Sequence, residues 1–120
     1  MFTVAVHTKK RRVDMSVYGE IDKYVLKVQT PSVHTNYKRV IYCFGSYGIA
    51  FLYFVPEDLP LGENKKREGK NVFDIYYRMR DWSAIVDVLR NEKPVWFSFD
   101  NYNNGIVKTG REEVGEEEAE

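Results

Sequence analysis

The sequence has little cysteine: Cys43 is its only one in 120 residues. No intrachain disulfide can form, so the class of small secreted domains held together by disulfides is excluded. Cys43 lies in the apolar run 40–44, where a buried thiol behaves as a small inert hydrophobe.

Long apolar runs are also absent. The longest, residues 49–55, covers seven residues, whereas a membrane-spanning helix needs about 20. Residues 1–7 are too short and too interrupted for the apolar core of a signal peptide. We therefore expect a soluble, cytoplasmic protein with no membrane partner.

Net charge is the third absence, because 18 basic and 18 acidic residues cancel. The balance is uneven along the chain: residues 112–120 contain six glutamates and no base, while residues 1–110 contain 17 bases and 12 acids. A hydrophobic content of 43% excludes a wholly disordered chain. We predict one compact, mildly basic domain over 1–110 and an acidic, disordered tail over 111–120.

Alternating apolar and polar residues dominate the sequence and predict β-strands. A three-stranded meander is expected over residues 2–7, 13–18 and 24–28. Gly19 and Asp22 lie between the second and third strands and are expected to form a turn there. The clearest hairpin joins residues 37–44 to 48–55 through a turn with glycine at both ends. Further strands are predicted at 73–78, 95–100 and 106–107. Because residues 49–55 have no polar row, that strand should be central.

One helix is predicted to begin at Asp81, whose side chain can accept hydrogen bonds from first-turn amides. Trp82, Ile85, Val86 and Leu89 follow at helical spacing, and Lys93-Pro94 ends the pattern. The fold class is therefore α+β: a strongly bent, mainly antiparallel sheet of about seven or eight strands, curled toward a half-barrel, with one helix packed on it.

Catalytic patterns are missing. His7, His34 and Cys43 are isolated and show no metal-ligand spacing, and no G-x-S-x-G motif or phosphate-binding glycine loop is present. Asp74 alternates with large apolar neighbours in a strand, and an ion pair on the outer side explains its position without catalysis. We predict a non-enzymatic protein with no catalytic residue, no metal and no cofactor.

Basic residues interleaved with aromatic residues are the most informative pattern. Exposed aromatic rings on a sheet can stack on unpaired bases while lysine and arginine neutralise phosphates. This pattern predicts a module that binds single-stranded nucleic acid through basic loops and exposed aromatic rings. The candidate residues are Lys9, Lys10, Arg11, Arg12, Tyr18, Lys38, Arg39, Lys65, Lys66, Arg67, Tyr76, Arg78, Arg80 and Trp96.

An alternative remains open, because tyrosine is favoured in strands and loop lysines keep many domains soluble. The sequence has 18 aromatic residues, and Tyr24, Tyr53, Tyr76 and Trp96 are difficult to place together in one small core. Exposed aromatic patches are typical of protein interfaces. The alternative prediction is thus a protein–protein interaction or homo-oligomeric module. In either case the acidic tail is solubilising, or it competes with an anionic partner.

Overall fold

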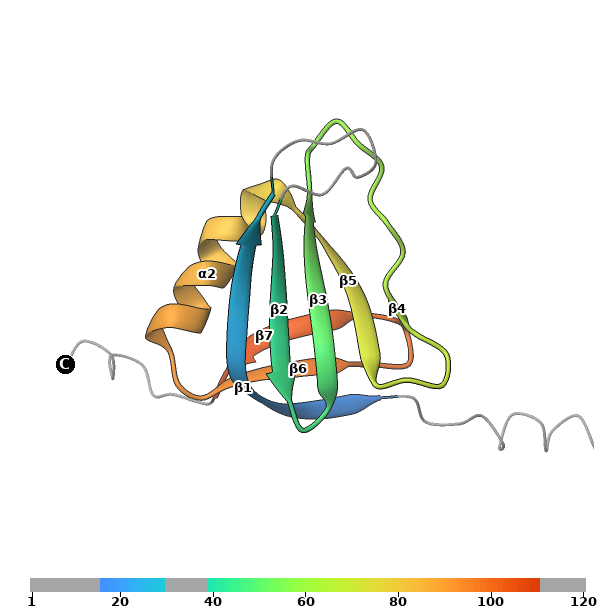
Figure 1. The fold of residues 1–120 in the computed structure, drawn as a ribbon, viewed down its shortest axis with the longest axis vertical. Coiled ribbons are helices and arrows are strands. Elements are labelled where there is room, and N and C mark those ends of the chain that lie inside the picture. The colour runs from blue at the N-terminus through green and yellow to red at the C-terminus, as the bar shows by residue number, and fades with distance from the viewer. Residues whose placement is uncertain (1–15, 30–38, 111–120) are drawn as a thin grey trace, which may run out of the picture.

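A computed structural model describes residues 16–29 and 39–110 of the chain (Figure 1). These residues form a seven-stranded sheet in the order β4-β5-β3-β2-β1-β6-β7, together with one α-helix and a 3₁₀ turn. The elements are β1 (Val17–Val28), β2 (Arg39–Gly45), β3 (Gly48–Val55), β4 (Lys65–Lys66), β5 (Val72–Arg78), η1 (Met79–Asp81), α2 (Trp82–Asn91), β6 (Val95–Phe99) and β7 (Gly105–Thr109).

The sheet is curled into a half-barrel, as expected, but it is mixed rather than mainly antiparallel. Every neighbouring pair is antiparallel except β3 and β5, which run parallel. The reason is the long connection 56–71, which returns from the end of β3 to the side where β3 began (Figure 1). A connection of this length can join two parallel strands, whereas a short turn can join only antiparallel ones.

Strand β1 corrects the predicted meander. Instead of two strands separated by a turn at residues 19–22, one continuous strand runs from Val17 to Val28. Its first four residues pair with β6, and Ile21 and residues 23–28 pair with β2, with a register shift between Ile21 and Lys23. Such a bulge bends a strand. The predicted strand 2–7 and the candidate tail 111–120 lie outside the described residues.

This bend divides the sheet into two parts that share one interior. We call residues 21–28 of β1 with β2, β3, β5 and β4 the β2 half, and residues 17–20 of β1 with β6 and β7 the β6 half. In Figure 1 the strands of the β6 half cross behind those of the β2 half. The ring of Phe73 in β5 lies 5.5 Å from Phe97 and 5.2 Å from Phe99 in β6, so aromatic contacts join the two inner sides.

The predicted hairpin is confirmed: β2 and β3 pair along their length, with Gly45 opposite Gly48. Gly48 has a φ of 121°, and a Cβ atom there would collide with the carbonyl oxygen of Asn71. Glycine is therefore required at the position where β3 begins. Strand β3 is central, between β2 and β5, as its continuous apolar sequence predicted.

Helix α2 covers one end of the core with the predicted apolar stripe. Leu89 is buried, and Trp82 meets Phe54 edge to face with 5.0 Å between ring centroids. Asp81 occupies the N-cap position, but its side chain makes no capping hydrogen bond; the 3₁₀ turn η1 leads into the helix instead. Among the described residues, no helix combines the length and apolar character needed to cross a membrane.

Candidate nucleic-acid interface

The outer side of the β2 half carries a group of half-buried aromatic rings. Strand pairing places side chains of five strands in one row, and two further rows flank it. We call the aromatic members of these rows the aromatic face: Tyr42, Phe44, Phe51, Tyr53 and Tyr76. Alternation along each strand directs these residues away from the core, because their neighbours in sequence point inward.

Rings of the aromatic face contact one another across three strands. Tyr42 and Phe51 meet edge to face with centroids 5.1 Å apart, and Tyr53 stacks on Tyr76 at 5.0 Å. Phe51 and Tyr53, two residues apart in β3, are separated by 6.3 Å. These four rings therefore form a continuous surface rather than isolated hydrophobic positions.

Lysine side chains border this surface on two sides. Lys23 and Lys27 are exposed on β1, and Lys65 is exposed on β4. Four strand spacings separate β1 from β4, or roughly 19 Å. Within the three rows, Asp74 is the only carboxylate. The aromatic surface thus lies between two sets of positive charges.

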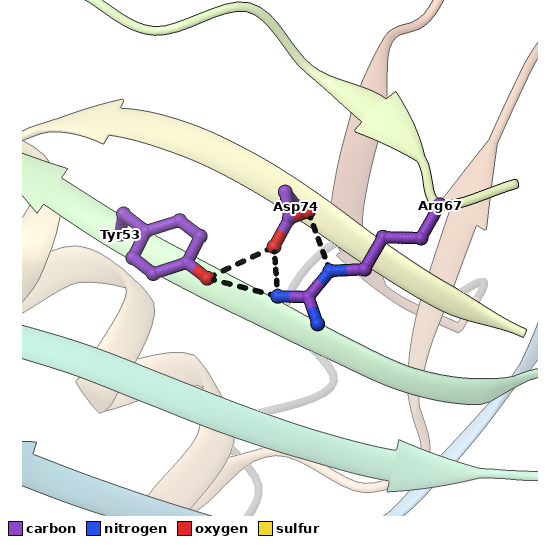
Figure 2. A network of polar contacts seen from close by, with 3 residues as sticks. All are labelled: Tyr53, Arg67 and Asp74. Carbon is purple, nitrogen blue, oxygen red and sulfur yellow. Dashed lines mark hydrogen bonds and ion pairs between the residues drawn. The ribbon is translucent and has the colours of Figure 1, made fainter. Parts of the chain in front are cut away.

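Arg67 lies on the outer side of the sheet beside Asp74 and Tyr53 (Figure 2). Its Nε donates to Asp74 Oδ2 at 2.8 Å and its Nη2 to Asp74 Oδ1 at 2.9 Å, a bidentate ion pair. Tyr53 Oη donates to the same carboxylate at 2.9 Å. The guanidinium carbon is 4.9 Å from the centroid of the Phe51 ring. Asp74 therefore holds the edge of the Arg67 guanidinium, and the Phe51 ring supports one of its planar faces.

The ionisation of Asp74 follows from this arrangement. Burial alone would raise the pKa of Asp74, but hydrogen bonds from Arg67 and Tyr53 outweigh it, and the pKa is lowered. Burial raises the pKa of Tyr53, and the hydrogen bond to Asp74 raises it further. Asp74 is thus ionised and Tyr53 protonated near neutral pH. The ion pair predicted from the sequence at Asp74 is confirmed, with Arg67 as its partner.

The connection 56–71 is attached to the sheet at several points. Arg78 donates from Nη1 to the carbonyl oxygens of Pro56 and Leu59, at 2.9 and 2.8 Å. Asn64 Oδ1 accepts from the amide of Tyr76 at 2.8 Å. Gly62 lies against the Tyr76 ring so closely that a Cβ would come within 2.6 Å of it. These contacts hold the segment that carries Arg67.

The predicted aromatic residues fall on both halves of the sheet. Tyr18 and Trp96 stack with centroids 4.9 Å apart and 5° between planes, on the outer side of the β6 half. Tyr76 lies on the outer side of the β2 half, beneath Gly62. Because the two inner sides pack together, these outer sides face away from each other. The three rings do not form one surface.

The predicted basic residues are not gathered on one surface either. Arg39 lies over the Trp82 ring at 5.2 Å, Arg78 holds the connection, and Arg80 pairs with Glu57 at 3.4 Å. Lys65 borders the aromatic face, and Lys66 and Arg67 follow it in the chain. Lys9, Lys10, Arg11, Arg12 and Lys38 lie outside the described residues.

Sequence reasoning missed Tyr42, Phe51, Lys23 and Lys27. Phe51 is half-buried on the outer side of β3, beneath Arg67. In residues 49–55 both alternating rows are apolar, so hydrophobicity does not reveal which row faces the interior. Alternation in residues 23–27, with two lysines separated by Val25, could have identified the lysine border.

Other parts of the described structure offer less chemistry. A groove of about 500 Å³ between the β1 bulge and the end of α2 is lined by side chains of both charges, including Asp22, Lys23, Glu92 and Lys93. In residues 16–29 and 39–110, no set of three histidine, cysteine or carboxylate residues could hold a metal ion. Cys43 is fully buried, and burial raises its pKa to about 12.

The chain matches no known family model, and comparison with curated proteins and with solved structures finds no similar protein.

Proposed function

We propose that this protein is a binding module for single-stranded nucleic acid and that the aromatic face is its contact surface. The observation that carries the proposal is the position of Arg67 above Phe51, held by a buried carboxylate between two sets of lysines. Bases of a single strand stack on aromatic rings and on guanidinium planes, and neighbouring lysines neutralise the phosphates.

Arg67 is suited to stacking because it is ordered before any ligand binds. Its side chain remains 40% exposed although it donates two hydrogen bonds to Asp74 and contacts the Phe51 ring. Nη1 makes no hydrogen bond in the part of the chain described by the structure, and Figure 2 shows it directed away from Asp74. A base placed on this guanidinium loses little side-chain entropy on binding.

Local charge, rather than total charge, supports this proposal. The described residues include 12 bases and 11 acids, so most of the basic excess of residues 1–110 belongs to segments 1–15 and 30–38. On the aromatic face, however, the single carboxylate is neutralised by Arg67 while Lys23, Lys27 and Lys65 are in no ion pair among the described residues. An anionic strand would encounter positive charge there without an opposing acid.

The same geometry favours binding over catalysis. Asp74 is the one carboxylate of the face, and its lowered pKa makes it a weak proton acceptor. A reducing compartment such as the cytoplasm suits a chain whose single cysteine is buried.

The test is a fluorescence-anisotropy titration of labelled oligothymidylate and oligouridylate at low salt. Phe51→Leu keeps an apolar side chain beneath Arg67 but removes the ring that supports the guanidinium, so the base stacked on Arg67 should bind about tenfold more weakly. Tyr18→Leu, the same type of change on the β6 half, should leave binding unchanged. Absence of binding by the wild-type chain, or equal losses in both variants, would contradict the proposal.

Lysine variants test the phosphate contacts separately. Replacing Lys23 and Lys27 together by glutamine should lower the slope of log Kd against log salt concentration by about 1.4, because each phosphate contact of a single strand contributes about 0.7. Lys108→Gln on the β6 half is the matched control and should retain the wild-type slope. Removal of residues 111–120 should tighten binding, since their glutamates compete with phosphates for the lysines.

A further inference from the structure

The outer side of the β6 half has a composition that the nucleic-acid proposal does not use. Strand pairing arranges six side chains in two parallel rows across β1, β6 and β7. One row is Glu20, Trp96 and Lys108, and the other is Tyr18, Ser98 and Ile106. We call these six residues the β6 face.

Large apolar groups on this face are exposed. Tyr18 is 56% exposed although it stacks on Trp96, and Ile106 is 43% exposed. An aromatic and an aliphatic side chain exposed on the same side of a sheet are typical of an interface that another surface covers.

Charges on the β6 face are opposite and lie on either side of its centre. Glu20 and Lys108 flank Trp96 in the same row, and two strand spacings separate their Cα atoms by roughly 10 Å. Among the described residues neither is in an ion pair; the Lys108 ammonium lies 5.3 Å from the Tyr18 ring centroid. Each charge is thus available to a partner of the opposite sign.

This arrangement is complementary to itself. Consider a second copy related by a twofold axis that runs parallel to the strands above Trp96. The rotation exchanges β1 with β7, so Glu20 of each copy faces Lys108 of the other, and Tyr18 faces Ile106. Trp96 then meets its own counterpart on the axis. A twofold interface requires such reciprocal pairing, in which residue i contacts j and j contacts i.

We propose that the β6 face pairs two copies of this chain in a twofold-symmetric dimer. The surface is small: five residues along a strand and three strands across give roughly 15 by 10 Å of backbone. An interface of this size is smaller than most specific interfaces, so the dimer should be weak, with a dissociation constant on the order of 100 μM. Pairing through the β6 face leaves the aromatic face open, since the two outer sides point apart.

The test is the weight-average mass of the full chain by sedimentation equilibrium, over concentrations on the order of 1–300 μM. The wild-type chain should pass from monomer to dimer in this range. Glu20→Lys alone and Lys108→Glu alone should each raise the dissociation constant at least about tenfold, because both place like charges opposite each other across the axis.

Mixing these two variants provides the decisive measurement. In the mixed pair, the two substituted side chains face each other with opposite charges at one site, and the unchanged Lys108 and Glu20 face each other at the other site. A heterodimer should therefore form with about the wild-type dissociation constant. The double variant should dimerise with itself for the same reason. A monomer at every concentration, a dimer insensitive to either substitution, or no recovery on mixing would overturn the proposal. None of these results depends on nucleic acid.

Discussion

The two outer surfaces of this curled sheet both carry aromatic side chains, but they hold them differently. On the aromatic face, a buried carboxylate receives three hydrogen bonds and fixes Arg67 over Phe51. On the β6 face, Tyr18 rests on Trp96 and beneath Lys108 without any ion pair. The same alternation of side chains along a strand can therefore produce two kinds of outer surface. One has an ordered polar group at its centre, and the other is apolar and exposed.

The difference originates in the connection 56–71. This segment supplies β4 and Arg67, and Arg78 and Asn64 attach it to β5. In the described residues, no comparable segment lies across the β6 half, whose last strand β7 pairs only with β6. The connection therefore converts the outer side of β3 and β5 into a partly covered surface.

Removing Arg67 should have the largest effect on stability. In Arg67→Gln, the Asp74 side chain, which is 5% exposed in the wild type, loses its charged partner, and an unpaired charge is costly in a protein interior. Because Arg67 itself is 40% exposed, we expect a loss of about 2–3 kcal/mol in the free energy of unfolding, measured by urea denaturation.

Arg80→Gln is the matched control for that measurement. Its ion pair with Glu57 is longer, at 3.4 Å, and the two side chains are 74% and 53% exposed. Water screens such a pair, so the loss should be below about 0.5 kcal/mol. Equal losses in the two variants would mean that Asp74 is not effectively buried.

The second expected effect concerns the pH dependence of the free energy of unfolding, to which Asp74 should contribute. Its folded-state pKa is lowered, below the value of about 3.9 for an unfolded chain. As the pH falls, the unfolded chain is protonated first, so this contribution is complete above about pH 5 and is lost as the pH falls through the folded-state pKa. Asp74→Asn should therefore lose less stability than the wild type between about pH 5 and pH 2.

Urea midpoints at several pH values measure this difference. Asp100, whose pKa is lowered chiefly by a hydrogen bond from the Asn104 amide, contributes to the slope that remains in both proteins. Parallel curves for the wild type and Asp74→Asn would show that Arg67 does not lower the pKa of Asp74.

Local sequence signals predicted much of this fold correctly. The hairpin of β2 and β3, the central position of β3, strand β5 and the apolar stripe of α2 all depend on neighbouring residues. Where two interpretations of a local signal compete, long-range packing decides. Gly19 and Asp22 resemble a turn, yet pairing with both β6 and β2 keeps β1 continuous.

The candidate site was less predictable because its centre joins residues that are distant in the chain. Tyr53, Arg67 and Asp74 meet only because β3 and β5 pair in parallel and the connection returns along the other side of β5, where β4 pairs with it. Composition indicated basic and aromatic residues, but it could not indicate that Arg67 would bind a buried carboxylate while Lys65 stays exposed. The distribution of aromatic rings between two opposite surfaces likewise follows from topology.

The junction between the two halves permits a prediction of opposite sign. Tyr47 packs between Phe73 and Phe97, and its hydroxyl is buried without a hydrogen-bond partner among the described residues. Because a buried unpaired hydroxyl is unfavourable, Tyr47→Phe should raise the free energy of unfolding by about 1 kcal/mol.

Tyr77→Phe is its matched control, because the Tyr77 hydroxyl also joins the two halves but donates to the carbonyl oxygen of Gly105 at 3.3 Å. Its removal should cost about 0.5–1 kcal/mol, measured in the same urea titration. A stabilising Tyr77→Phe or a destabilising Tyr47→Phe would contradict this account of the junction.

The smallest effect is expected on the β6 face. Tyr18→Ala removes one partner of an exposed aromatic pair, and at low concentration, where the chain is monomeric, it should cost only about 0.5 kcal/mol. Phe51→Ala, beneath Arg67, should cost about 2 kcal/mol or more by leaving a gap under the guanidinium. If Tyr18→Ala lowered the free energy of unfolding as much as Phe51→Ala, the Tyr18–Trp96 pair would stabilise the monomer itself. Its rings would then not be available to a second copy.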